Sequence, residues 1–190
     1  MQKREFLQGI FIGVIVVLAA LSRVIPHPWN FTPVIAILIF SAATFKNSYF
    51  KFAIPFLVIV LSDVLLHIKD GSGFHSGTPL VYGSYVAISL FSFALLKKIN
   101  VGKVLLTSVL SSVIFFLITN FALFYPASPT VNLALGAYPH TLEGVIASYT
   151  SAIPFFRNAL TGDLIFTGIL FGAYTLSTLI LSKTQRVTSI

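Results

Sequence analysis

The sequence contains no cysteine, and only 5 of its 190 residues are acidic. Without cysteine the chain has no disulfides, thiol nucleophiles, covalent haem attachment or cysteine-based zinc and iron–sulfur sites. A metal would need histidine and carboxylate ligands, and the spacing of the available ones matches no known metal site. We therefore expect no metal and no cofactor. The residues considered are His27, His75, His140 and Glu143.

Charged residues of either sign are scarce. They make up 9% of the chain, against 56% for hydrophobic residues, and the mean hydropathy is +0.95. An ordinary soluble domain has about 25% charged residues, and a soluble fold of this composition would expose far too much apolar surface to water. The composition predicts an all-α integral membrane protein.

The apolar residues form runs, and roughly 20 such residues cross the hydrocarbon of a bilayer as a helix. We expect residues 1–190 to form a single transmembrane domain, a bundle of six transmembrane helices. The second span is short, begins at Pro33 after the potential cap Thr32, and is expected to be tilted less or partly re-entrant. The predicted spans are about residues 5–24, 32–45, 51–68, 80–96, 102–124 and 155–182.

Basic residues set the orientation, because Lys and Arg are retained on the cytoplasmic side. With both termini cytoplasmic, nine of the 12 basic residues lie inside. We expect a multi-pass protein of the bacterial inner (plasma) membrane, whose net charge of +7 reflects topology and implies no nucleic-acid partner. The nine residues are Lys3, Arg4, Lys46, Lys51, Lys97, Lys98, Lys103, Lys183 and Arg186.

Polar residues within or beside the apolar runs are the main functional signal. Ionisable groups are costly in lipid and mark functional sites, and on the predicted topology these residues all fall in the outer half of the membrane. They predict an outward-facing polar cavity that binds a small molecule. The predicted substrate-binding residues are Arg23, His27, Asn30, Asp63, His67, Tyr82, Tyr85, Asn120, Arg157, Asn158 and Asp163.

Roles follow from the chemistry of these side chains. Arg23 and Arg157 are expected to attract an anionic group, the three asparagines to orient it, and Asp63 and Asp163 to hold the arginines or meet a cation. The alternatives are that the Asp and Arg residues form internal ion pairs, that the two tyrosines belong to an interfacial belt, and that Ser and Thr of residues 102–124 bond neighbouring helices.

Two external connections complete the expected site. Residues 70–77, DGSGFHSG, have the composition of a flexible linker and are predicted to be a mobile connector. Residues 125–153 contain three prolines and no Lys or Arg. This stretch is long enough to serve as a lid, and its part from Thr141 to Ile153 is predicted as a short surface helix, separate from the sixth span that follows Pro154.

The segments SRVIPHPWNFTP at 22–33 and IPFFRNALTGD at 153–163 resemble an uncharacterised family of small bacterial membrane proteins regarded as transport proteins. In architecture the chain is similar to the S components, the substrate-binding subunits of energy-coupling factor transporters. That resemblance implies capture of a vitamin or trace nutrient, no nucleotide site of its own, and partnership with a transmembrane coupling subunit and ATPases. It also implies that Gly9 and Gly13 contact the coupling subunit.

The leading prediction is thus a non-enzymatic, membrane-embedded substrate-binding subunit of an uptake transporter for a small molecule. One alternative is a structural subunit of a membrane complex, with the polar residues as internal ion pairs. A weaker one is a membrane-embedded enzyme that uses Asp63, His67 and Asp163 as acid–base groups.

Overall fold

A computed structural model describes residues 2–133 and 136–188, including all side chains there except those of residues 2–5, 7, 8 and 181–188. Lys3, Arg4, Lys183 and Arg186, which the orientation prediction used, have side chains outside that description. Over the described residues the chain forms six α-helices, two short 3-10 helices and, in place of a sheet, one isolated bridge. The helices are α1 (Gln2–Leu21), η1 (Ser22–Val24), α2 (Val34–Thr44), α3 (Ser48–Asp70), α4 (Thr78–Leu95), α5 (Val101–Thr119), η2 (Ala122–Phe124) and α6 (Leu142–Thr188).

Four of these helices are long and apolar enough to cross a membrane. The qualifying segments are Ser48–Asp70, Thr78–Leu95, Val101–Thr119 and Leu142–Ile180, whereas α2 and the apolar part of α1 are shorter. Only 22% to 28% of each qualifying segment is buried within the protein. Helices with such large exposed apolar faces are suited to lipid rather than to water.

Helix α2 is the centre of the bundle. All of its residues except Ala43 are buried, and α1, α3, α4, α5 and α6 all pack against it. A helix that is apolar on every side belongs in the interior, and Phe40 illustrates the packing, with its ring 5.2 Å from that of Phe171 on α6. The other five helices are arranged around this short core.

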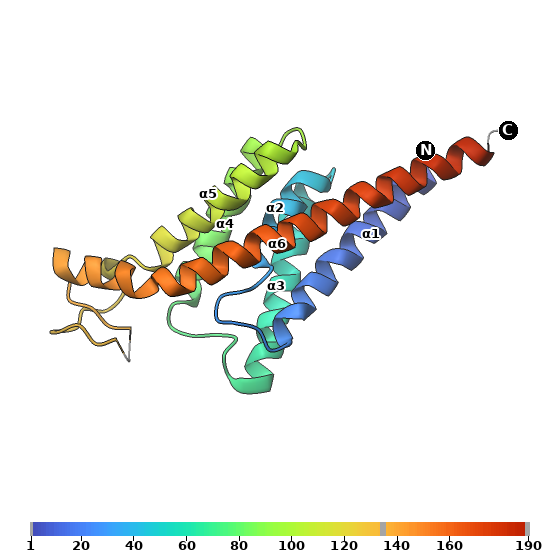
Figure 1. The fold of residues 1–190 in the computed structure, drawn as a ribbon. Coiled ribbons are helices and arrows are strands. Elements are labelled where there is room, and N and C mark those ends of the chain that lie inside the picture. The colour runs from blue at the N-terminus through green and yellow to red at the C-terminus, as the bar shows by residue number, and fades with distance from the viewer. Residues whose placement is uncertain (1, 134–135, 189–190) are drawn as a thin grey trace.

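Helix α6 differs from the sequence prediction. Residues 142–188 form one continuous helix of 47 residues with Pro154 inside it, seen as the long orange-to-red ribbon in Figure 1. The expected break at Pro154 and the separate surface helix before it were therefore wrong. Proline removes one backbone N–H, but neighbouring groups in membrane helices compensate for the loss, so that a proline inside such a helix is tolerated.

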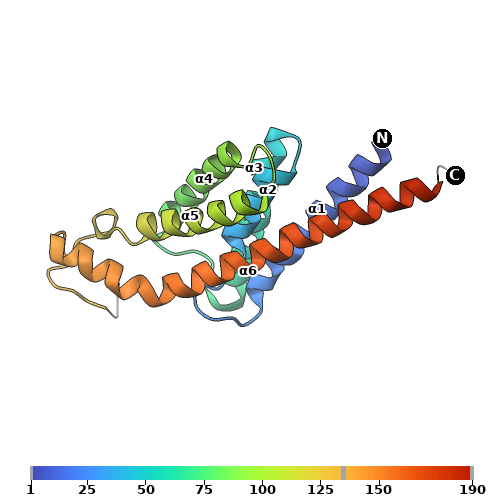
Figure 2. The ribbon, with the colours of Figure 1, turned by 45° about the horizontal axis from the view of Figure 1, so that its top comes forward.

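The connections separate into two sets. The α2–α3 and α4–α5 connections lie at the same end of the molecule as both termini, and the segments 22–33, 71–77 and 120–141 lie toward the other (Figure 1). Lys46, Lys97 and Lys98 belong to the first set. Helix α1 and the second half of α6 run side by side and extend beyond the other helices (Figure 2).

Candidate functional site

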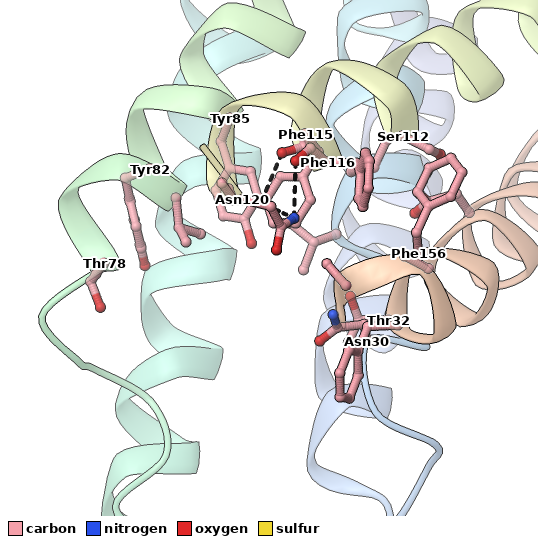
Figure 3. A pocket seen from close by; sticks show the side chains of 18 of the residues that line it. Asn30, Thr32, Thr78, Tyr82, Tyr85, Ser112, Phe115, Phe116, Asn120 and Phe156 are labelled. Atoms are coloured by element: carbon pink, nitrogen blue, oxygen red, sulfur yellow. Dashed lines mark hydrogen bonds between the residues drawn. The ribbon is translucent and has the colours of Figure 1, made fainter. Parts of the chain in front are cut away.

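A cavity of about 360 Å³ opens at the end of the bundle away from the termini. Its walls come from the 22–33 segment, α2, α3, the 71–77 segment, α4, α5, Tyr125 and α6. In Figure 3, Tyr82 and Tyr85 project from α4 on one side, and Asn30 and Thr32 lie on the other. The structure places seven of the predicted residues around this cavity: Arg23, Asn30, Asp63, Tyr82, Tyr85, Asn120 and Asp163.

Asp63 is fully engaged by protein groups. Arg23 Nη2 lies 2.6 Å from Asp63 Oδ1, and the side chains are only 11% and 6% exposed. The Tyr82 hydroxyl donates to Asp63 Oδ2 at 2.5 Å, and Arg23 Nη1 donates to the Ser62 hydroxyl. Both carboxylate oxygens and the arginine charge are therefore satisfied internally, as the ion-pair alternative expected, and Tyr82 is part of this network rather than of an interfacial belt.

Asp163 is a second buried carboxylate, in a different situation. It is 2% exposed, and its Oδ2 accepts a hydrogen bond from the Ser112 hydroxyl on α5 at 2.6 Å. No Lys, Arg or His among the described side chains forms an ion pair with it. Its carboxyl group therefore has no cationic partner among the described side chains.

Aromatic rings form much of the remaining wall. Tyr85 stacks on Phe115, with ring centroids 5.7 Å apart and an interplanar angle of 11°, and Phe116 lies 4.7 Å from Phe156. Between these groups, Asn120 Nδ2 donates to the Phe116 carbonyl at 2.9 Å (Figure 3). This bond fixes the Asn120 amide so that its carbonyl oxygen is free to accept a further hydrogen bond.

The 22–33 segment is held in place by α6. A Cβ on Gly162 would lie 3.3 Å from both Phe31 Cα and Thr32 N, so the two backbones are in close contact there. Asn158 Nδ2 donates to the Trp29 carbonyl at 3.1 Å. Asn30 has a left-handed backbone with φ of 61°, a conformation that asparagine tolerates better than most residues. These contacts fix the position of Asn30 at the cavity.

The 71–77 segment is more than a connector. Gly71 ends α3 with φ of 77°, and Gly73 packs so closely on α3 that a Cβ there would overlap the Asp63 carbonyl oxygen and crowd His67 N. Ser72, Gly73 and His75 then line the cavity. The sequence prediction placed this segment at the site as a mobile connector, without naming these residues as part of the wall.

Four predicted residues do not line the cavity: His27, His67, Arg157 and Asn158. His27 is exposed and bonds backbone carbonyls of its own segment, while the exposed His67 packs beside Phe74 with ring centroids 5.7 Å apart. Arg157 is exposed. It lies six residues before Asp163, which on a helix turns the two about 120° apart.

These positions correct three expectations. The predicted pairing of Arg157 with Asp163 was wrong, and Asp163 bonds Ser112 instead. The two arginines expected to attract an anion are not brought together, since Arg157 lies outside the cavity and the charge of Arg23 is matched by Asp63. The acid–base group that combined His67 with Asp63 and Asp163 is not assembled at the cavity.

Several wall residues were missed although a signal for them existed. On α6, the lining residues recur at the spacing of one helix face, three or four residues apart. The sequence reasoning singled out polar residues only and so passed over the aromatic and small members of this set. The α6 wall consists of Ala152, Phe155, Phe156, Ala159 and Asp163.

A second hollow of about 560 Å³ adjoins the first, beneath the 125–141 segment. The two share Thr119, Asn120, Tyr125, Ala152 and Phe155. Burial raises the pKa of the Tyr125 phenol, which is thus protonated at neutral pH and donates to the Thr119 carbonyl at 2.6 Å. Tyr125 therefore ties the beginning of this long connection to the end of α5.

The glycine pairs and the α5 hydroxyls have distinct surroundings. A Cβ on Gly9, Gly13, Gly168 or Gly172 would meet nothing within 4 Å, so these glycines are not used for close packing within the bundle. By contrast, Ser112 and Ser108 bond α6, the latter through Thr167 at 3.3 Å. Ser108 and Ser112 thus follow the interhelical alternative, whereas the hydroxyls of Thr107 and Thr119 donate to backbone carbonyls of α5 itself.

Comparison with known proteins gives a family and nothing more specific. The model of a family of unknown function, DUF6580, matches residues 4–186. No curated protein and no solved structure matches the chain.

Proposed function

Since this chain belongs to the DUF6580 family, whose function is unknown, we propose its function from the cavity: it is the substrate-binding subunit of an uptake transporter. In this proposal the cavity captures a small nutrient from outside the cell. The observation that carries the proposal is the cavity with its polar and aromatic wall, in which Asp163 has no ionic partner among the described residues, in a mostly apolar chain. Its volume of about 360 Å³ is typical of small-molecule sites, which are mostly apolar with a few placed polar groups.

The proposal includes a six-span topology with both termini cytoplasmic in a bacterial inner membrane. The positive-inside rule supports it, because the connections that carry Lys46, Lys97 and Lys98 lie at the end with the termini (Figure 1). The cavity lies toward the opposite end and would thus face outward. The 120–141 connection, over the second hollow, is then an external lid.

Partners follow from the resemblance to energy-coupling factor S components. The sequence carries no phosphate-binding glycine loop ending in Gly-Lys-Ser/Thr, so energy from ATP would come from other subunits. Gly9 and Gly13 leave an open, small-residue face on α1. Small residues let transmembrane helices approach closely, and we place the contact with a transmembrane coupling subunit there.

Native mass spectrometry of protein purified gently from its own host tests the proposal. The expected result is a co-purifying small solute together with a coupling subunit and ATPases. Depletion of the solute in an Asp163→Asn variant, but not in Glu143→Gln, would assign the solute to the cavity, because Glu143 is an exposed carboxylate on the same helix. Protein that carries neither solute nor subunits would refute the transport function and favour a structural subunit.

A further inference from the structure

The charged groups around the cavity indicate which class of substrate it binds. Among the lining side chains, Arg23 is neutralised by Asp63 at 2.6 Å. Asp163 is left as a buried carboxyl group without an ionic partner among the described residues. The first turn of α2, with Val34 and Ile35 in the wall, contributes a partial positive charge of about one half at its N-terminus. When Asp163 is ionised, the summed charge of these groups is negative.

Two hydrogen-bond acceptors of the wall, on Asp163 and Asn120, are free to meet a ligand. Asp163 Oδ2 accepts from Ser112, but Oδ1 accepts no hydrogen bond from a described residue. The Asn120 amide nitrogen bonds the Phe116 carbonyl and the Thr119 hydroxyl, which leaves its oxygen as an acceptor. The hydroxyls of Thr119 and Tyr82 are already used as donors within the protein. Around Asp163 and Asn120 the wall thus offers acceptors to a ligand that brings donors, whereas Arg23 Nε is a buried donor without a partner among the described residues.

The apolar part of the wall is aromatic rather than aliphatic. Tyr85 and Phe115 are stacked, and Phe116 and Phe156 pack together across the α5–α6 contact. The faces of aromatic rings attract cations as well as burying apolar surface. A negative carboxylate beside aromatic rings is a combination suited to an organic cation.

We propose that this cavity binds a small organic cation with an N–H donor, such as a protonated amine attached to a planar ring. The ammonium group lies between Asp163 Oδ1 and the Asn120 carbonyl oxygen, and the ring packs against Tyr85 and Phe116. This assignment rests on the proposed substrate-binding function and adds the charge of the substrate to it. It replaces the anionic substrate that the sequence predicted.

Three probes that share a phenylethyl group and differ in the charge and identity of its terminal group test the assignment: phenethylamine, 2-phenylethanol and 3-phenylpropionate. Their binding to the purified protein in lipid nanodiscs is measured by calorimetry at neutral pH. A hydrogen bond to a charged group contributes more binding energy than a neutral one. We therefore expect the amine to bind about tenfold more tightly than the alcohol or the carboxylate. Asp163→Asn, which keeps the size of the side chain, should abolish this preference, while Asp163→Glu and the exposed control Glu143→Gln should retain it.

The cation assignment is overturned if the alcohol or the carboxylate binds as tightly as the amine, or if the preference survives in Asp163→Asn. If no probe binds, the charge of the solute found by native mass spectrometry tests the cation assignment. A cationic solute supports the assignment, and a neutral or anionic one refutes it while the substrate-binding function stands. The absence of any solute refutes the proposed function itself.

Discussion

Loss of the Asp63 carboxylate should destabilise the protein strongly. In Asp63→Asn, Arg23 loses its 2.6 Å ionic partner while its side chain is only 11% exposed, and Tyr82 loses a charged acceptor at 2.5 Å. Breaking a buried pair from one side costs about 3 to 5 kcal/mol. For a domain of this size each kcal/mol lowers the melting temperature by about 2 to 4 °C, so we expect a decrease of roughly 6 to 20 °C.

A double-mutant cycle isolates the pair. Melting temperatures of the wild type, Arg23→Gln, Asp63→Asn and the double variant are measured by scanning calorimetry in one detergent, with the exposed Glu143→Gln as a control for loss of a carboxylate. Each single variant leaves the charge of the other residue buried and unpaired, whereas the double variant removes both charges. The double variant should therefore be more stable than the sum of the two single effects predicts. Additive effects, or a shift in Asp63→Asn no larger than that of Glu143→Gln, would show that the pair does not stabilise this end of the bundle.

Other predictions concern the close contacts and the topology. Gly73→Ala should lower the melting temperature by about 2 to 12 °C, because its Cβ overlaps the α3 backbone and overpacking costs about 1 to 3 kcal/mol; an unchanged value would mean that this segment does not pack on α3. Gly162→Ala should cost less, since its contacts are at 3.3 Å, and Gly168→Ala, with nothing within 4 Å, should cost nothing. The chain has no cysteine, so single Ser76→Cys and Lys98→Cys variants report topology directly: an impermeant maleimide should label the former on intact spheroplasts and the latter only after lysis, and the reverse pattern would invert the proposed orientation.

The helices were predictable because the apolar runs are long and their ends are marked. Helix α3 ends at Asp70 before a Gly/Ser stretch, and α4 ends just before Lys97 and Lys98. Pro154 misled the prediction because the usual cost of an internal proline was applied to a helix whose surroundings compensate for it. Local sequence rules thus located the segments but not the continuity of α6.

The candidate site was predictable in depth but not in rotation. Position along the chain placed Arg157 and Asp163 in the same layer, yet the helix turns only Asp163 toward the cavity. Which face of α6 points inward depends on its packing against α5 and α2, and a single sequence does not contain that information for polar residues considered one at a time. The aromatic wall around Phe116 and Phe156 was missed because apolar residues in a membrane helix resemble the lipid-facing ones.

The short length of α2 affects the size of the cavity. Its 11 residues extend about 16 Å at 1.5 Å per residue, roughly 14 Å less than a hydrocarbon core of 30 Å. The cavity lies at the start of this short helix, where Val34 and Ile35 form part of its wall beside Asn30 and Thr32 of the 22–33 segment. The position at which this buried helix begins therefore helps to set the room available to a ligand, and insertions just before Pro33 would change it by moving Asn30 and Thr32 relative to the helix.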